Sequence, residues 1–393
     1  MAPETVKGLL LQGFLVWLWW YALLMKNEIV ERIASQSGIA ELVEILCEKL
    51  SGSDLHSLLL TVLKRRIAKA SAADLLGDSP VSRLCDLDGR LLNAVEKEAL
   101  EAASCFAARE LSPVMPLGAV SLLTGLDQGN VLSTIRAFEV LSDPTVAMAL
   151  DCARLRRKPQ LRKESLKLCS NSRVLRFPQP ANPSFTSHFK LFSLVTAGRD
   201  KGSFAFECEA LFEHIDSYLA FLQRLEGLGF QFGQVAVEVS DTRVVTHLCS
   251  RFALSLDDVR SQVRARDSAS AAALLTAHQE SWPKNINTLK DFELPAHLLV
   301  QLNLLEEAVC SKLSRKYPQV QFGFNLQRLT GLGYYQGPCF HIKAYAAGES
   351  YAIADGGFTD WTQILLSDTK ERLFTSAIGT ELLCRKFYKE LRD

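Results

Sequence analysis

The chain has 393 residues, enough for more than one domain, and its 44 lysines and arginines are balanced by 44 aspartates and glutamates. This neutrality gives no electrostatic reason to expect binding to nucleic acid or to an anionic membrane. A hydrophobic content of 48% is typical of a folded globular protein and excludes a disordered one.

The first feature along the chain is an apolar run of 17 residues, Leu9–Met25, which holds three of the five tryptophans. It is shorter than the roughly 20 residues that a membrane-spanning helix needs, and no small-residue cleavage site follows it as in a signal peptide. Three interpretations remain open: a buried helix of the first domain, a helix attached to a membrane interface, and a helix that binds a partner protein. We favour the first, in a cytoplasmic protein.

Residues 1–75 are expected to form an all-helical domain. Whether a protein partner binds through this domain is left open. Apolar residues recur at helical spacing from Ile29 to Leu46, and Ser53 or Asp54 is expected to cap a helix over Leu55–Lys69. A stretch rich in small residues, Ala68–Ser82, is typical of a linker to a second domain over residues 76–393.

The second domain mixes helical and strand-like segments. Helices are expected over Leu92–Leu111, Leu211–Leu228, an insertion at 243–316, and Ser376–Leu391. Strands are expected within Arg173–Ala197 and over Ser203–Cys208, Gln234–Ser240, Gln319–Asn325, Pro338–Tyr345 and Tyr351–Ala354. Because strands and helices do not alternate regularly, the order predicts an α+β fold, an antiparallel sheet with helices on one face, and not a doubly wound parallel sheet.

The most informative segment is Leu329–Phe340, in which Gly331, Gly333 and Gly337 surround Tyr334 and Tyr335. Glycine lets a backbone approach a ligand closely, and adjacent side chains in extended backbone point to opposite faces. One interpretation has a tyrosine in contact with a ligand, and the other has both tyrosines packed in the sheet.

This segment resembles the Leu-Asp-Tyr-Tyr-Thr-Gly signature of histidyl-tRNA synthetases and of their non-synthetase relative, the regulatory subunit of ATP phosphoribosyltransferase, in which it lines the amino-acid pocket. The resemblance covers about residues 85–390. Leu92–Leu111 stands where the dimer-forming first motif begins, the strands over 189–208 stand at the ATP-binding second motif, and Ala377–Glu381 stands at the third. It implies a class II synthetase-like catalytic domain and a homodimer.

The resemblance also implies an amino-acid pocket. Asp143 is the nearest match to the carboxylate that holds the α-ammonium group, although Asp-Pro is equally typical of a helix N-cap. Asp355 and Asp360 are either pocket carboxylates or turn residues, and His341 either contacts a ligand carboxylate or has no role. The expected ligand-binding residues are Asp143, Thr145, Gly331, Gly333, Tyr334, Tyr335, Gly337, His341, Asp355, Gly356 and Gly357.

The sequence departs from the family where phosphate chemistry takes place. Adenylation builds negative charge on phosphorus, and the family neutralises it with arginines. Ser193, Thr330 and Leu382 stand at those three positions. Replacement arginines are candidates for catalysis, namely Arg199, Arg328 and Arg385.

Nucleotide binding receives a weak prediction, with ATP and magnesium as cofactors only if adenylation survives. Arg199, Phe204, Phe206 and Glu207 are its candidates, and the alternative for the two phenylalanines is a place in the strand core. The seven histidines show no metal-binding spacing, and the ten cysteines contain no Cys-x-x-Cys pair, so we expect buried, reduced thiols rather than a zinc site. Cys208 and Cys339 are not expected to be nucleophiles.

The chain ends about ten residues after the third motif, so we expect no anticodon-binding domain and no tRNA substrate. The main hypothesis is a histidyl-tRNA synthetase-like paralogue that binds an amino acid or a related small molecule and serves as a regulatory or accessory dimer subunit. The alternatives are an ATP-dependent ligase that activates a carboxylate for a non-tRNA acceptor, and a scaffold attached through the tryptophan-rich segment. The basic run Arg154–Lys167 is interpreted as a solvated helix face, with phosphate or RNA binding as its alternative.

Overall fold

The computed structural model describes residues 28–39, 41–77, 79–177, 186–264, 289 and 292–389. The apolar run Leu9–Met25 lies outside these residues, as do residues 265–288 in the middle of the helical insertion. The chain divides into two compact units after Gly77, and each is described by itself.

The described part of the first unit is helical, as expected. It contains α2 (Glu28–Ser37), α3 (Leu42–Glu44), a π-helical segment (Ile45–Lys49), α4 (Gly52–Ile67) and a 3-10 turn (Ala72–Leu76). The N-cap of α4 is Ser51, whose hydroxyl accepts a hydrogen bond from the Asp54 backbone N–H at 3.1 Å, so the prediction of Ser53 or Asp54 as the cap was wrong. None of the described residues between 28 and 77 is buried. No helix in the described part of the whole chain is both long and apolar enough to cross a membrane.

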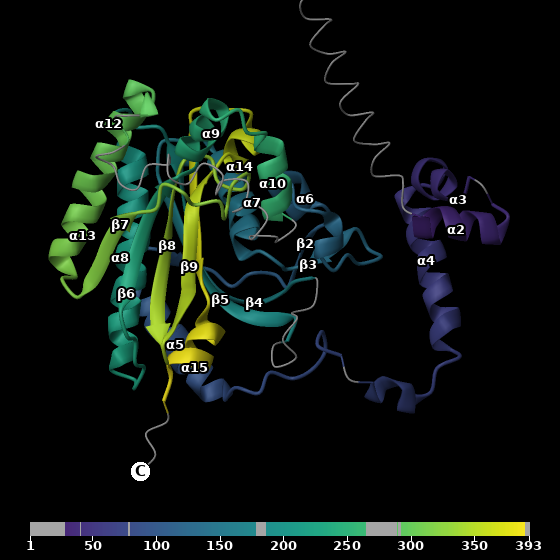
Figure 1. Cartoon of the computed structure of the whole chain (residues 1–393). Helices are drawn as coiled ribbons and strands as arrows, with labels where there is room; N and C mark the ends of the chain where they lie inside the picture. The colour runs from purple at the N-terminus through teal and green to yellow at the C-terminus, as the bar shows by residue number, and fades with distance from the viewer. Residues whose placement is uncertain are drawn as a thin grey trace, which may run out of the picture. The chain divides into compact units, whose positions relative to one another are not determined.

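The second unit is built on an eight-stranded sheet with the order β1-β4-β5-β10-β9-β8-β6-β7, beside a small sheet of β2 and β3 (Figure 1). The strands are β1 (Ala107–Ala108), β2 (Val114–Pro116), β3 (Phe138–Val140), β4 (Leu166–Leu175), β5 (His188–Arg199), β6 (Val235–Asp241), β7 (Val320–Phe324), β8 (Pro338–Ala346), β9 (Glu349–Thr359) and β10 (Glu371–Ile378). The six inner strands are antiparallel, as predicted, and the outermost pair at each edge is parallel.

Helices cover both faces of this sheet, so the expectation of helices on one face alone was wrong. The helices are α5 (Gly89–Ala102), α6 (Ala119–Thr124), α7 (Pro144–Arg156), α8 (Ala205–Glu226), α9 (Thr242–Arg251), α10 (Leu256–Arg264), α12 (Ala296–Leu305), α13 (Ser311–Lys316), α14 (Trp361–Leu366) and α15 (Thr380–Phe387); 3-10 turns lie at Gln128–Asn130 and Pro159–Leu161, and a π-helical segment at Glu306–Cys310. Helix α8 packs on one face with α5 beside it, whereas α7 and α14 pack on the other. Each face therefore has its own apolar core.

Several boundaries differ from those predicted, including that of β9, which extends to Thr359. Ser203–Cys208 is no strand, because α8 begins at Ala205; Phe206 and Ala210 both face the core one helical turn apart. Helix α5 ends at Ala102 rather than Leu111. The helix expected from Ser376 begins at Thr380, because Glu371–Ile378 is a strand.

A buried chain of polar side chains ties α8 to the sheet. His214 contacts Thr196 Oγ1 at 2.9 Å through Nε2 and Ser376 Oγ at 2.7 Å through Nδ1, and the Tyr218 hydroxyl lies 2.8 Å from the same serine oxygen. Burial lowers the pKa of His214 well below its ordinary value, with a smaller contribution from the charge of Lys167. The imidazole is therefore neutral in the folded protein.

Candidate functional site

A row of five residues crosses the sheet from β5 to β6, on the face opposite α8. Strand pairing places Ser193 beside Ala377, then Asp355, His341 and Glu238. We call these five residues the polar row, since all of them except Ala377 are polar. Their neighbours along each strand are buried against α8, and side chains alternate across a strand, so the row points the other way. At about 4.8 Å between strands, the row spans about 19 Å.

Charged partners occupy the β9 to β6 part of the row. Arg328 Nη2 lies 2.7 Å from Asp355 Oδ1, and His341 Nε2 lies 3.4 Å from Asp355 Oδ2. Lys343 Nζ lies 2.6 Å from Glu238 Oε1. Burial is the largest single effect and acts to raise the pKa of both carboxyl groups. Arg328 and His341 together outweigh it at Asp355, and Lys343 and Asn325 with the charge of His341 outweigh it at Glu238, so each pKa lies below its ordinary value. Both groups are therefore carboxylates at neutral pH.

Arg328 is buried but has hydrogen-bonding capacity to spare. Its side chain is 2% exposed, whereas that of Asp355 is 44% exposed. Burial acts to lower the pKa of Arg328, yet the neighbouring Cys339, Asp355 and Tyr335 raise it above its ordinary value, so the guanidinium stays charged. Its Nε donates to the Thr330 carbonyl at 2.8 Å, but no described residue accepts a hydrogen bond from Nη1. A buried donor without a partner is rare in folded proteins and marks a place for a ligand or water.

The segment Arg328–Gly337, called here the Tyr-Tyr loop, covers one end of this face. It is a turn and not extended backbone, since the Tyr335 N–H donates to the Gly331 carbonyl at 2.8 Å. The expectation that the two tyrosines point to opposite faces was therefore wrong: their rings meet edge to face at 5.0 Å.

Tyr334 reaches α7. Its hydroxyl donates a 2.8 Å hydrogen bond to Asp143 Oδ2, while Asp143 Oδ1 accepts from the Thr145 N–H and hydroxyl at 3.0 and 2.7 Å. Asp143 is thus the N-cap of α7, the alternative left open by the sequence. Burial, followed by the charge of Asp143, raises the pKa of Tyr334 well above its ordinary value, so the phenol remains a donor.

Tyr335 is held by glycines. A Cβ on Gly331 or on Gly357 would lie 2.5 Å from its ring, closer than any side chain could approach. The Arg328 guanidinium lies 5.6 Å from the centre of the same ring. Gly331, Gly333 and Gly337 all have positive φ, which explains glycine in this loop.

Asp355 lies inside β9 together with Gly356 and Gly357, so the interpretation of Asp355 as a turn residue was wrong. A Cβ on Gly356 would lie 2.4 Å from Ser376 Cβ, which shows that the glycine allows β9 and β10 to pack closely. Asp360, which follows β9, is the N-cap residue of α14.

The sequence matches no known family model and no curated protein. Solved structures do resemble the chain. One described as an ATP phosphoribosyltransferase regulatory subunit/histidyl-tRNA synthetase from Bacillus halodurans has a TM-score of 0.60 at 14% identity, over 80% of this chain and 84% of that one. Histidyl-tRNA synthetase from Nostoc sp. PCC 7120 has a TM-score of 0.55 at 16% identity, over 79% and 73% of the two chains. The S. aureus enzyme without ligands has a TM-score of 0.54 at 11% identity, over 80% and 75%.

The fold is class II synthetase-like. At these identities the likeness concerns the fold alone.

The strand pairing corrects the hairpin expected over residues 189–208. The hairpin on this face is β4–β5, so Ser193 lies within β5 and the segment Gly198–Gly202 is not the loop between the two strands. Arg176, which directly follows β4, was missed. Its Nε donates to the Ser142 carbonyl at 2.8 Å, its guanidinium lies 5.5 Å from the centre of the Phe189 ring, and its charge acts on Tyr334. A β4–β5 strand pair read from the sequence would have revealed it.

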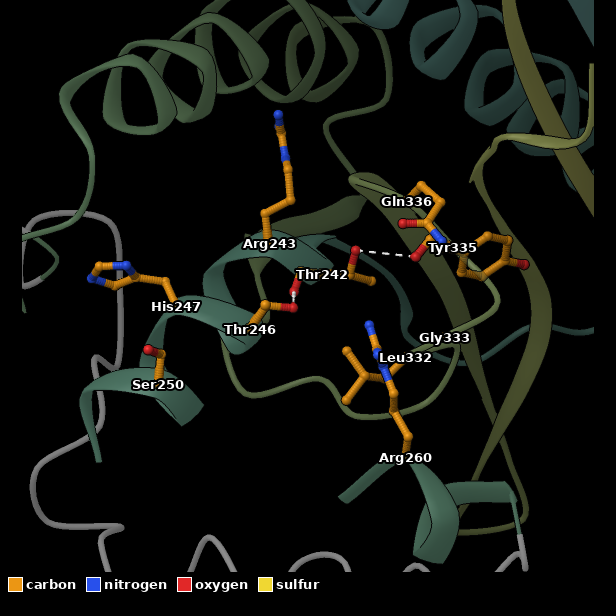
Figure 2. Close-up of a pocket in the computed structure, with 10 residues that line it drawn as sticks. All are labelled: Thr242, Arg243, Thr246, His247, Ser250, Arg260, Leu332, Gly333, Tyr335 and Gln336. Atoms are coloured by element: carbon orange, nitrogen blue, oxygen red, sulfur yellow. Dashed lines mark hydrogen bonds between the residues drawn. The ribbon is translucent and has the colours of Figure 1, made fainter. Parts of the chain in front are cut away.

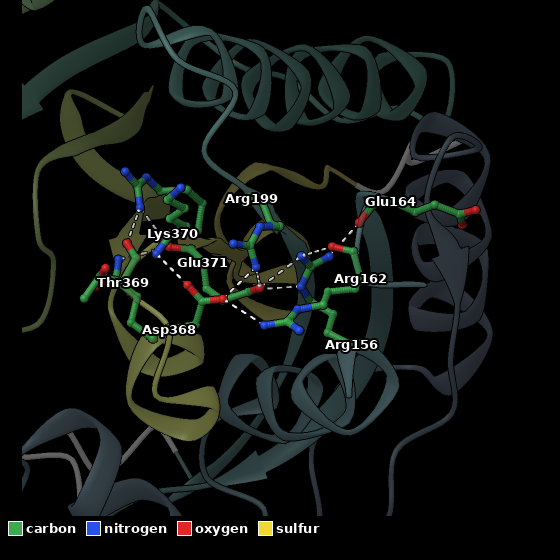
Figure 3. Close-up of polar contacts among 10 residues, drawn as sticks. Arg156, Arg162, Glu164, Arg199, Asp368, Thr369, Lys370 and Glu371 are labelled. Atoms are coloured by element: carbon green, nitrogen blue, oxygen red, sulfur yellow. Dashed lines mark hydrogen bonds and ion pairs between the residues drawn. The ribbon is translucent and has the colours of Figure 1, made fainter. Parts of the chain in front are cut away.

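The three candidate catalytic arginines do not converge. Arg199 pairs with Asp368 at 2.6 Å and Glu371 at 3.3 Å (Figure 3), and Arg385 pairs with Asp86 at 2.5 Å and Glu381 at 3.0 Å. Glu371 and Ala377 are six residues apart on β10, so Arg199 lies about 20 Å from the polar row.

Apart from Arg199, the candidate nucleotide-binding residues lie on the α8 face of the sheet, opposite the polar row. Phe206 is 2% exposed and packs in the core beneath α8, and Glu207 pairs with Arg372 at 2.9 Å. Phe204 lies under the Arg243 guanidinium, 5.7 Å from ring centre to Cζ. In the described part of the chain, no group of three His, Cys, Asp or Glu side chains could hold a metal. The candidate nucleotide-binding residues therefore do not form a site that fits ATP and magnesium.

The remaining site residues do not suggest covalent chemistry. Burial, the largest effect, raises the pKa of the Cys339 thiol to about 12 and that of Cys208 to about 11, so neither forms a thiolate at neutral pH.

In the basic run Arg154–Lys167, three of the basic side chains pair with carboxylates. Arg156 is buried against Glu371, and Arg162 and Lys167 pair with Asp368 and Glu213, respectively.

Proposed function

We propose that the second unit binds a small zwitterion, an amino acid or a close relative, on the polar row, and that it serves as a regulatory or accessory subunit rather than aminoacylating tRNA. The observation that carries this proposal is the Arg328–Asp355 pair. A buried cation with a free N–H and a carboxylate that is 44% exposed lie 2.7 Å apart. A ligand carboxylate would accept from Arg328 Nη1 while its ammonium group meets Asp355, because both contacts join opposite charges.

The arginines support binding without adenylation. Losing one donor aimed at a developing negative charge typically costs about 10²–10³ in rate. Arg199 and Arg385 are engaged by carboxylates away from the row. Arg176, whose Nε donates to the Ser142 carbonyl, acts on Tyr334 through its charge, which acts to lower the pKa of that phenol.

Calorimetry of the full chain against the twenty amino acids tests the proposal. We expect binding of at least one of them, and its loss in Arg328→Lys and Asp355→Asn. Arg199→Lys is the matched control, since it changes an ion-paired arginine of the same sheet outside the row, and it should bind like the wild type. Absence of binding by the wild type, or unchanged binding in Arg328→Lys, contradicts the proposal. Amino-acid-dependent pyrophosphate exchange would instead establish the ligase alternative.

We also propose that the second unit forms a homodimer through one apolar surface. Six large apolar side chains within 25 residues of sequence are exposed by 36–81%, an unusual density for a monomer surface: Val114, Leu117, Leu122, Leu126, Leu132 and Phe138. They lie on and around β2, α6 and β3, just after α5, which stands where the family's dimer-forming motif begins.

A further inference from the structure

A cavity of about 380 Å³ lies between α9, α10 and the Tyr-Tyr loop (Figure 2). Its lining residues are Thr242, Arg243, Thr246, His247, Ser250, Arg260, Leu332, Gly333, Tyr335 and Gln336. We propose that this cavity is a second ligand site, separate from the polar row, which binds a small anion through Arg260.

The wall of the cavity is basic and rich in hydroxyl groups. The ten residues that line it include two arginines and a histidine, and none of these ten is acidic. The nearest carboxylate on α9 is its N-cap, Asp241, which is already used by Arg243: the Nε–Oδ1 and Nη2–Oδ2 distances are 2.9 and 2.5 Å. The charge of Arg243 is therefore neutralised by Asp241, which leaves Arg260 as the arginine of the wall that is available to a ligand.

Arg260 is poorly satisfied by the protein itself. Its Nε is buried, and nothing in the described part of the chain accepts a hydrogen bond from it. Its ion pair with Asp257 is long, 3.6 Å, and that aspartate is 92% exposed. An exposed pair of this kind contributes little. Figure 2 shows the Arg260 side chain reaching from α10 towards Leu332 of the Tyr-Tyr loop, so the guanidinium is directed across the cavity.

Helix α9 supplies hydroxyl groups. Thr242, Thr246 and Ser250 are spaced four residues apart and share one face of the helix. The Thr246 hydroxyl donates to the Thr242 carbonyl at 3.0 Å and the Thr242 hydroxyl donates to the Tyr335 carbonyl at 3.3 Å, so Ser250 is the hydroxyl on this face left to donate to an anion. A cavity of about 380 Å³ is at the lower end of the range for small-molecule sites, so a phosphate- or carboxylate-bearing metabolite fits better than a bare ion.

The cavity shares the Tyr-Tyr loop with the polar row but not its charged groups. The Gly337 N–H donates to Thr242 Oγ1 at 2.9 Å, and the Thr242 N–H donates to the Gly337 carbonyl at 3.1 Å, so the first turn of α9 is bound to the end of the loop. Arg328 and Asp355 do not line the cavity. The inference therefore stands whether or not an amino acid binds at the row.

Titration of the full chain with inorganic phosphate at constant ionic strength tests the inference, by calorimetry and by the thermal unfolding midpoint. We expect saturable binding with a matching rise of the midpoint. Removal of a charged hydrogen-bonding partner in Arg260→Gln should raise the Kd about tenfold or more, and Arg260→Lys should give an intermediate Kd. Arg251→Gln is the matched control, since Arg251 belongs to α9 but pairs with Glu293 at 3.1 Å and does not line the cavity.

Three outcomes would overturn the inference. The first is the absence, in the wild type, of any saturable effect of phosphate beyond that of sodium chloride. The second is an equal Kd in Arg260→Gln and the wild type. The third is loss of phosphate binding in Arg328→Lys together with its retention in Arg260→Gln, which would place the anion on the polar row instead.

Discussion

The hydroxyl of Tyr334 donates a 2.8 Å hydrogen bond to the carboxylate of Asp143, which lies 191 residues earlier in the chain. The same carboxylate caps α7 through the Thr145 N–H. The Asp143 side chain thus joins the Tyr-Tyr loop to α7, and this contact fixes the position of the loop relative to that helix.

Tyr334→Phe is expected to lower the free energy of unfolding by about 1–2 kcal/mol, because it leaves a half-buried carboxylate oxygen without its donor. Urea unfolding followed by fluorescence measures the change. Tyr345→Phe is the control, since Tyr345 is 38% exposed, and it should change stability by no more than about 0.5 kcal/mol. Equal effects of the two substitutions would show that the Tyr334–Asp143 hydrogen bond does not contribute to the free energy of unfolding.

The ion pair between Arg156 and Glu371 is buried, with 0% and 2% of the two side chains exposed (Figure 3). Arg156→Met leaves Glu371 without its closest partner and is expected to cost about 3–5 kcal/mol of stability in a denaturant titration. Arg162→Gln removes an exposed arginine of the same cluster and should cost less than about 1 kcal/mol. A small effect of Arg156→Met would mean that Arg199 alone suffices for Glu371.

Gly357→Ala is expected to destabilise the protein by about 1–3 kcal/mol and to weaken ligand binding at the polar row, because its Cβ would meet the Tyr335 ring at 2.5 Å. Gly323→Ala is a matched control within β7, where a Cβ meets nothing within 4 Å. Thermal unfolding of the two variants side by side measures the difference. A neutral Gly357→Ala would show that the loop moves freely.

His214 predicts a loss of stability below pH 6.5. Its pKa is lowered in the folded protein, so between that value and the ordinary 6.5 only the unfolded chain takes up the proton. Its contribution to stability is complete above pH 6.5 and falls by up to about 1.4 kcal/mol per pH unit below it. Urea titrations between pH 5.0 and 7.5 measure the slope, and His214→Gln should flatten it. An unchanged slope in the variant would exclude His214 as its source.

Leu122→Glu should dissociate the proposed homodimer, because Leu122 is 81% exposed in the apolar surface and a charge there would be buried in the interface. Sedimentation equilibrium of wild type and variant gives the masses. Ile364→Glu is the control, since Ile364 is 55% exposed on α14, outside that surface. A monomeric wild type, or a dimeric Leu122→Glu, counts against this interface.

Strand β10 shows where prediction from sequence failed. Six of its eight residues are buried, on both faces of the sheet, so the apolar-polar alternation of a strand is absent. The sequence pattern therefore placed the start of the following helix at Ser376, which lies inside the strand. Ser203–Cys208 was predicted as a strand because Phe204 and Phe206, two residues apart, fit the period of a strand. In the structure Phe204 is the N-cap of α8 and Phe206 lies in its first turn.

By itself, the sequence determined the features that depend on local patterns. These were the α+β class with its antiparallel inner strands, and the Asp-Pro pattern that offered Asp143 as one of two alternatives, a ligand or the cap of α7. Only the tertiary structure decided which residues meet. The polar row draws Ser193, Ala377, Asp355, His341 and Glu238 from five strands, and a shift of one residue in any strand would turn its member to the other face. The partners of Arg199, Arg328 and Arg385 follow from that register, because each arginine pairs with a carboxylate that the sheet or its closing helix places beside it.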